Sequence, residues 1–153
     1  MLPMITSIDE VRKAKIMIER VKRELKEEKT SFDENIKIGV MIETPAAVMI
    51  SGELAREVDF VSIGTNDLTQ LTLGMDRTSE RLEPYYNTHH PAILKMIRIV
   101  TNNVHLENKH VSICGDLAAD LTMTEFFIQL GVDELSVAPI DVLALRKKIR
   151  EIQ

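Results

Sequence analysis

Reactive side chains follow three short apolar runs of this sequence, at the point where each run ends. Glu43 follows Ile36–Ile42, Asn66 and Asp67 come shortly after Phe60–Ile63, and Cys114 follows His110–Ile113. Two carboxylates on neighbouring strand ends can share one hard cation, with Mg²⁺ the best candidate and Mn²⁺ its substitute. A thiol beside them can carry acid/base chemistry. These residue types therefore indicate a metal-assisted site for a small anion.

Each of these residues also has a structural explanation. Glu43 can pair with a nearby lysine or arginine, and Asp67 can cap the helix predicted at Leu68. A lone cysteine is commonly a small buried hydrophobe. Arg77 can bind phosphate or carboxylate through its forked guanidinium, or it can be an ordinary surface arginine. The residue types alone leave both explanations open.

The elements that must position these residues alternate along the chain. Strands are predicted at 1–6, 36–42, 60–63, 110–113 and 135–138. Helices are predicted from the N-cap Ser7 through Leu25, at 46–57, in part of 69–81, and at 92–105, 121–130 and 142–152. The strands are interpreted as apolar on both faces, which is typical of a parallel sheet covered by helices.

This alternation predicts an α/β fold, a partial (β/α)8 TIM barrel of about five βα units, since a complete barrel takes about 250 residues. Parallel strands bring all the strand-end residues to one rim. The helix after Ser7 is expected to pack on the sheet through Val11, Ala14, Ile18, Val21 and Leu25. A coiled-coil seam is the alternative, but the pattern lasts only about two heptads.

Composition limits the functional classes. The chain has 153 residues, 44% of them hydrophobic, and a formal net charge of −5, so one domain spanning 1–153 is expected and nucleic-acid binding is not. The single cysteine permits no intramolecular disulfide. No apolar run approaches the roughly 18 residues of a membrane span. A cytoplasmic protein without a membrane span is the expectation.

Three ordered motifs resemble a known family. They are Ile38-Gly39-Val40-Met41-Ile42-Glu43-Thr44-Pro45-Ala46-Ala47, then Ile63-Gly64-Thr65-Asn66-Asp67-Leu68-Thr69-Gln70 with Asp76-Arg77, and finally Cys114-Gly115-Asp116-Leu117-Ala118. Together they resemble the C-terminal barrel domain of the phosphoenolpyruvate-utilising enzymes, and within that family the enzyme I group of the bacterial sugar phosphotransferase system. The resemblance covers essentially the whole chain.

The resemblance implies a role for each rim residue. Glu43 and Asp67 would be the Mg²⁺ ligands, Asn66, Arg77 and Thr65 would bind the substrate phosphate, and Cys114 would protonate enolpyruvate. The implied reaction transfers phosphate from phosphoenolpyruvate to a protein histidine. Asp116 stands where the family usually has Glu and Ala119 where it usually has Gly, so the carboxylate near Cys114 is on a shorter side chain.

The same resemblance implies partners and a larger protein. The phosphohistidine domain and the first barrel strands are absent, so the chain is expected to be a fragment holding about the last five βα units, and to be inactive alone. Its implied partners are phosphoenolpyruvate, the phosphohistidine domain, the phosphocarrier protein of the sugar phosphotransferase system, and a second copy in a homo-oligomer.

Three alternatives remain open. The fragment can be a non-catalytic dimerisation or regulatory module, since its sheet edges are open. It can be a domain like that of pyruvate phosphate dikinase or phosphoenolpyruvate synthase. It can also be a Mg²⁺-dependent lyase or aldolase, for which Cys114 would have little use.

Overall fold

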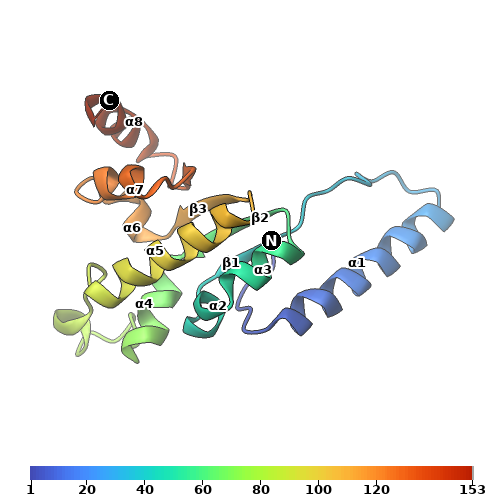
Figure 1. The fold of residues 1–153 in the computed structure, drawn as a ribbon, viewed down its shortest axis with the longest axis horizontal. Helices are drawn as coiled ribbons and strands as arrows, with labels where there is room; N and C mark the ends of the chain where they lie inside the picture. Colours follow the sequence, from blue (N-terminus) through green and yellow to red (C-terminus); the bar gives the residue numbers. More distant parts are fainter. Residues whose placement is uncertain (153) are drawn as a thin grey trace.

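The structure is a computed structural model, and it describes residues 1–152 (Figure 1). Its centre is a parallel sheet of four strands in the order β1-β2-β3-β4. The strands are β1 (Gly39–Ile42), β2 (Phe60–Gly64), β3 (His110–Cys114) and β4 (Glu134–Leu135). Leu2 adds a fifth parallel position through an isolated bridge to Val40. The predicted α/β fold with parallel strands is therefore confirmed.

Helices follow each of these parallel positions. They are α1 (Ile8–Glu27), α2 (Pro45–Met49), α3 (Ser51–Glu57), α4 (Thr65–Leu73), α5 (Pro91–Leu106), α6 (Asp116–Ala119), α7 (Thr124–Leu130) and α8 (Val142–Ile152), with a short 3₁₀ turn η1 (Glu83–Tyr85). The order of the chain thus repeats strand and helix, as the sequence predicts.

The two faces of the sheet differ. One face is fully buried and apolar, and it carries Val40, Ile42, Val61, Ile63, Val111 and Ile113. The opposite face carries Met41, Ser62 and Ser112, which the strand register places side by side. The expectation of strands apolar on both faces is therefore wrong. Alternate residues of a strand point to opposite faces, and the serines occupy the second face, the one that also carries the strand-end site.

The outer strands are shorter than predicted. Of 1–6, only Leu2 pairs, through its N–H to Gly39 and its carbonyl to Met41, both at 2.8 Å. β1 begins at Gly39 instead of Ile36. Just before β1, the N–H of Ile38 donates to the side-chain carboxylate of Asp59 instead of to a backbone carbonyl of the neighbouring strand. β4 ends at Leu135, three residues before the predicted end.

Several helices begin or break at unpredicted residues. The helix predicted over 46–57 breaks at Ile50, and the Ser51 hydroxyl bonds the Val48 carbonyl there at 2.8 Å. α4 begins at Thr65, so Asn66 and Asp67 lie in its first turn instead of before it. α6 was not predicted, and α7 begins after a turn in which Asp120 accepts from the N–H and hydroxyl of Thr122.

The long helix α1 packs along only part of its length. Ser7 is its N-cap, as predicted, and Glu10 accepts the Ser7 N–H at 3.0 Å. Val11 is fully buried, but Val21 is 47% exposed and Met17 is 68% exposed. Figure 1 shows α1 extending beyond the sheet, beside the chain that returns to β1. The expected packing of the whole helix on the sheet is therefore wrong.

Candidate functional site

A cavity of about 220 Å³ lies where β1, β2 and β3 end. We call it the rim cavity. It is lined by Met41, Glu43, Gly64, Thr65, Asn66, Asp67, Arg77, Cys114 and Gly115. Every site residue predicted from the sequence is in this set. The structure therefore brings them together, while the role of each stays a prediction.

The two carboxylates differ in how they are held. Glu43 is only 5% exposed, and one of its oxygens, Oε1, accepts the Met4 N–H at 2.7 Å. This hydrogen bond holds the carboxylate in place through Oε1, and the other oxygen, Oε2, lies next to Gly64. The Asp67 side chain is 39% exposed, and its nearest cation is Arg77, with Nη2 at 3.9 Å from Oδ1. Asp67 thus remains accessible from the cavity.

This donor set fits a magnesium ion that keeps other ligands. Within residues 1–152, no group of three or more His, Cys, Asp or Glu side chains is arranged to hold a metal. Mg²⁺ typically binds through one or two carboxylates, with water and phosphate oxygens in its other positions. Glu43 and Asp67 fit that pattern, whereas a zinc-type cage of protein ligands does not.

The start of α4 supplies the polar groups between the carboxylates and the thiol. The Asn66 oxygen Oδ1 accepts the Asp116 N–H at 3.0 Å, so its NH₂ group is the part that can donate to a ligand. Thr65 is 1% exposed, and its hydroxyl donates to the Cys114 carbonyl at 2.8 Å. The Thr65 hydroxyl therefore joins β3 to α4. The backbone N–H of Thr65 is the group of this residue that can donate to an anion.

Two glycines that were not predicted as site residues allow this close approach. A Cβ on Gly64 would lie 2.6 Å from Glu43 Oε2. A Cβ on Gly115 would lie 2.6 Å from the Thr65 hydroxyl and 2.7 Å from Asn66 Oδ1, and the backbone there has φ +91°. Both glycines lie at or just after a strand end, and that position is the signal that could have identified them.

Cys114 is half-buried, and its sulfur has several neighbours that sequence reasoning missed. The Ser62 hydroxyl lies 3.6 Å from Sγ, while Met41 Sδ and the Ile63 carbonyl each lie at 3.5 Å. Burial raises the pKa of the Cys114 thiol, the Ser62 hydrogen bond lowers it, and the carboxylates of Glu43 and Asp67 raise it again, with a net increase. The thiol therefore keeps its proton at neutral pH.

Asp116, two residues after Cys114, contributes to the site through its backbone. The Asp116 side chain is exposed, while its N–H holds Asn66. On the opposite side, Tyr86 donates its hydroxyl to the Asn66 carbonyl at 3.0 Å, and this ties the segment after Arg77 to α4. Tyr86 lies twenty residues along the chain from Asn66, and no sequence pattern indicated the contact.

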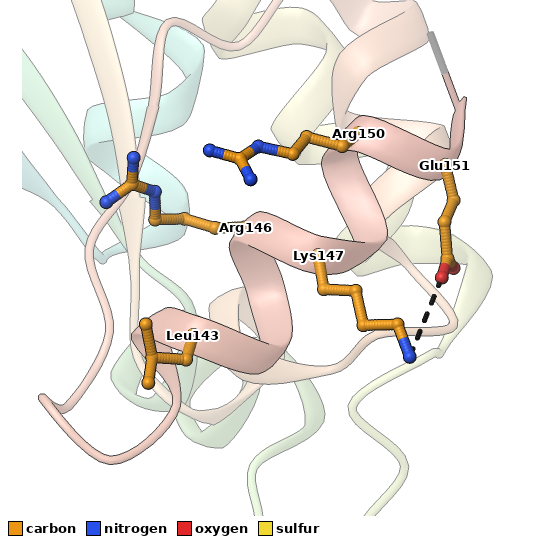
Figure 2. A pocket seen from close by; sticks show the side chains of 5 residues that line it. All are labelled: Leu143, Arg146, Lys147, Arg150 and Glu151. Atoms are coloured by element: carbon orange, nitrogen blue, oxygen red, sulfur yellow. Dashed lines mark ion pairs between the residues drawn. The ribbon is translucent and has the colours of Figure 1, made fainter.

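A larger cavity of about 350 Å³ lies away from the strand ends, on α8. Figure 2 shows the guanidinium groups of Arg146 and Arg150 extending from this helix, with Lys147 and Glu151 paired at 3.9 Å. No strand-end residue lines it. The rim cavity, although smaller, is the one that combines carboxylates, an amide, a guanidinium and a thiol.

Successive parallel strands with helices between them and reactive groups at the strand ends define an α/β protein of the TIM-barrel type, here as part of a barrel. The family described as PEP-utilising enzyme, PEP-binding domain, matches residues 1–153. The chain therefore belongs to the phosphoenolpyruvate-utilising enzyme family.

Curated relatives agree with this assignment. The chain is 47% identical over 152 residues to the phosphoenolpyruvate-protein phosphotransferase of Haemophilus influenzae, covering 99% of this chain and 26% of the relative. It is 42% identical over 151 residues to the protein of the same name from Buchnera aphidicola subsp. Schizaphis graminum, with the same coverage. The chain thus spans about a quarter of the length of these relatives.

Solved structures support the fold. A citrate lyase from Burkholderia xenovorans superposes with a TM-score of 0.71 at 18% identity, over 96% of this chain and 47% of that one. RipC from Yersinia pestis superposes with a TM-score of 0.61 at 12% identity, over 99% and 65%. At these identities the likeness concerns the fold alone.

Among the described helices, none is both long and apolar enough to span a membrane.

Proposed function

We propose that this chain is the phosphoenolpyruvate-binding, C-terminal portion of a phosphoenolpyruvate–protein phosphotransferase (enzyme I). The reaction is Mg²⁺-dependent transfer of phosphate from phosphoenolpyruvate to a protein histidine, with pyruvate as the other product. The observation that carries the proposal is the convergence of two carboxylates, an amide, a guanidinium and a thiol on one rim cavity.

Glu43 and Asp67 would hold the magnesium ion, which when bound supplies positive charge to the phosphate and enolate oxygens. Glu43 is fixed for this role by the Met4 N–H. Asp67 is close to Arg77, whose guanidinium would turn from the carboxylate to the phosphate when substrate binds. The NH₂ group of Asn66 and the N–H of Thr65 would donate to the same phosphate.

Cys114 would supply the proton that completes the reaction. When phosphate has left, the thiol proton passes to the methylene carbon of enolpyruvate, giving the methyl group of pyruvate and a thiolate that solvent reprotonates. A thiol whose pKa is raised by burial is protonated at neutral pH and so is ready to donate.

The chain spans 26% of the length of its Haemophilus influenzae relative, so the complete reaction would need parts of the protein that lie outside these residues. We propose that residues 1–153 form one domain that is inactive alone and requires the remaining barrel strands. The phosphohistidine domain, the phosphocarrier protein and a second copy are its proposed partners, and the cytoplasm its proposed location.

A chimera tests this function. This chain replaces the corresponding segment of the Haemophilus influenzae relative, to which it is 47% identical, and pyruvate release from phosphoenolpyruvate is measured. Cys114→Ala should lower turnover by about a hundredfold to ten-thousandfold, the usual contribution of a general acid. Binding of phosphoenolpyruvate should persist in calorimetry. A lyase using the same carboxylates would have little use for the thiol, so unchanged turnover would contradict the proposal.

The metal ligands are tested in the same chimera. Asp67→Asn should abolish the Mg²⁺ dependence of phosphoenolpyruvate binding, because it removes the accessible carboxylate of the rim cavity. Asp9→Asn, at an exposed position in α1, is the matched control and should bind as the parent does. Equal binding by both variants would exclude Asp67 as a ligand.

A further inference from the structure

The sheet face below the rim cavity carries two serines in equivalent places. Ser62 in β2 and Ser112 in β3 are register partners, and both are buried, at 3% and 7% exposure. Ser112 donates to the Val61 carbonyl at 3.5 Å, a backbone partner. The Ser62 hydroxyl is instead directed at the sulfur of Cys114, at 3.6 Å. The two hydroxyls therefore have different partners.

A buried hydroxyl directed at a thiol makes a weak hydrogen bond, because neutral sulfur is a poor acceptor. The bond becomes much stronger when the sulfur carries a negative charge. The sulfur's own proton has separate acceptors, Met41 Sδ and the Ile63 carbonyl, each at 3.5 Å. Ser62 can therefore stay bonded to the sulfur while the thiol proton turns into the cavity.

We propose that Ser62 is the positioning residue of Cys114: its hydroxyl holds the sulfur beneath the rim cavity and donates to the thiolate that proton transfer leaves behind. This inference rests on the proposed function of Cys114 as the acid. In the step concerned, the S–H bond breaks, its proton forms a C–H bond at the enolpyruvate methylene, and the electron pair stays on sulfur. Ser62 keeps its own proton throughout.

The charges around the sulfur explain why such a donor matters. Glu43 at the end of β1 and Asp67 in α4 both disfavour a thiolate, and burial acts in the same direction. Arg77 lines the same cavity, but its nearest partner is Asp67. Among the groups bonded to the sulfur, the Ser62 hydroxyl is the one that favours its charged form.

Two measurements test the role of Ser62. The first is the rate at which iodoacetamide alkylates this chain near neutral pH, which reports Cys114 alone because it is the single cysteine. Ser62→Ala should slow alkylation by about tenfold, through loss of a hydrogen bond to a charged group. The second is turnover in the chimera, where kcat should fall by a similar factor while KM for phosphoenolpyruvate stays unchanged.

Matched variants separate positioning from a general packing effect. Ser112→Ala removes a hydroxyl from the same face and strand register without touching the sulfur, so both rates should stay at the parent's value. Ser62→Thr keeps the hydroxyl and should recover most of the lost rate. Equal effects of Ser62→Ala and Ser112→Ala, or no effect of Ser62→Ala on alkylation, would overturn the inference.

Alkylation requires no turnover, so the two proposals fail in different ways. If Cys114→Ala leaves turnover intact, the proposed function fails even when Ser62→Ala slows alkylation. If Cys114→Ala abolishes turnover but Ser62→Ala changes neither rate, the proposed function stands and the role of Ser62 is rejected.

Discussion

The rim cavity and the later part of α1, Ile16–Glu27, which we call the distal half, both carry many charged side chains, but these are held differently. At the rim, Glu43 is held by the Met4 N–H and Asn66 by the Asp116 N–H, bonds that join residues 39 and 50 positions apart. In the distal half of α1, the ion pairs join exposed residues that are near in sequence: Arg20 pairs with Glu24 one turn along the helix, and Lys26 pairs with Glu34 eight residues on. Long-range backbone bonds fix side chains, whereas local ion pairs on the surface do not.

The largest predicted loss of folding stability comes from a substitution in the lining of the rim cavity. Gly115→Ala should destabilise the fold by about 3 kcal/mol, because the backbone region it occupies is nearly exclusive to glycine. The new Cβ would also meet Thr65 and Asn66. Urea denaturation measures the loss, and the alkylation rate of Cys114 should change with it.

Gly74→Ala is the matched control for this substitution. Gly74 also has positive φ, +63°, at the end of α4, but a Cβ there meets nothing within 4 Å. It should cost only about 1 kcal/mol, the strain of a left-handed residue. Equal losses at the two glycines would show that the contacts across the rim are unimportant.

The next effect compares the two halves of α1. Val11→Ala should destabilise by about 2 kcal/mol, since Val11 is fully buried and its loss leaves a cavity. Met17→Ser should change stability by no more than about 0.5 kcal/mol, because Met17 is 68% exposed. A large loss for Met17→Ser, measured by thermal denaturation, would show that the distal half is packed in solution.

These contrasts also explain what the sequence could predict. Apolar runs ending in polar residues located the strands, and parallel strands necessarily bring Glu43, Asp67 and Cys114 to one edge. The contact of Ser62 with Cys114 could not be predicted in the same way, because it depends on the register between β2 and β3. Nor did the alternation of apolar residues reveal the break at Ile50.

The exposed half of α1 was mispredicted for a related reason. Helical periodicity from Val11 to Leu25 indicates an apolar face, but it does not show which part of that face has a neighbour. Only the first part reaches the hydrophobic core, through Val11. The later part faces the segment 32–36 across an open apolar groove. Periodicity therefore predicted the helix correctly and its packing incorrectly.

A smaller effect extends the comparison to Asp133, between α7 and β4. Its carboxylate accepts the Val111 N–H at 2.8 Å and contacts His105 at 3.1 Å. Burial alone would raise the pKa of Asp133, but these contacts outweigh it and the pKa is lowered from 3.8. The ionised form thus stabilises the fold above pH 3.8, and this contribution is lost as the pH falls toward the lower folded pKa.

Melting temperatures measured from about pH 6 down to pH 3 test this contribution. The parent should lose stability on acidification more steeply than Asp133→Asn, whose side chain does not titrate. Glu125→Gln is the control, since its partner is the neighbouring Gln129 on the same helix, and its profile should follow the parent. Parallel profiles for the parent and Asp133→Asn would contradict the anchoring role.

The smallest effect belongs to the ion pair of Arg20 with Glu24. The two side chains are 74% and 53% exposed, and the contact is 3.1 Å. An exposed pair one helical turn apart gains little, because water screens the charges and the side chains lose freedom. Arg20→Ala should therefore change the free energy of unfolding by less than about 0.5 kcal/mol and lose even that at high salt. A salt-independent loss of 1 kcal/mol or more would contradict this, because it would mean that the ion pair on α1 stabilises the fold as the bonds around the rim cavity do.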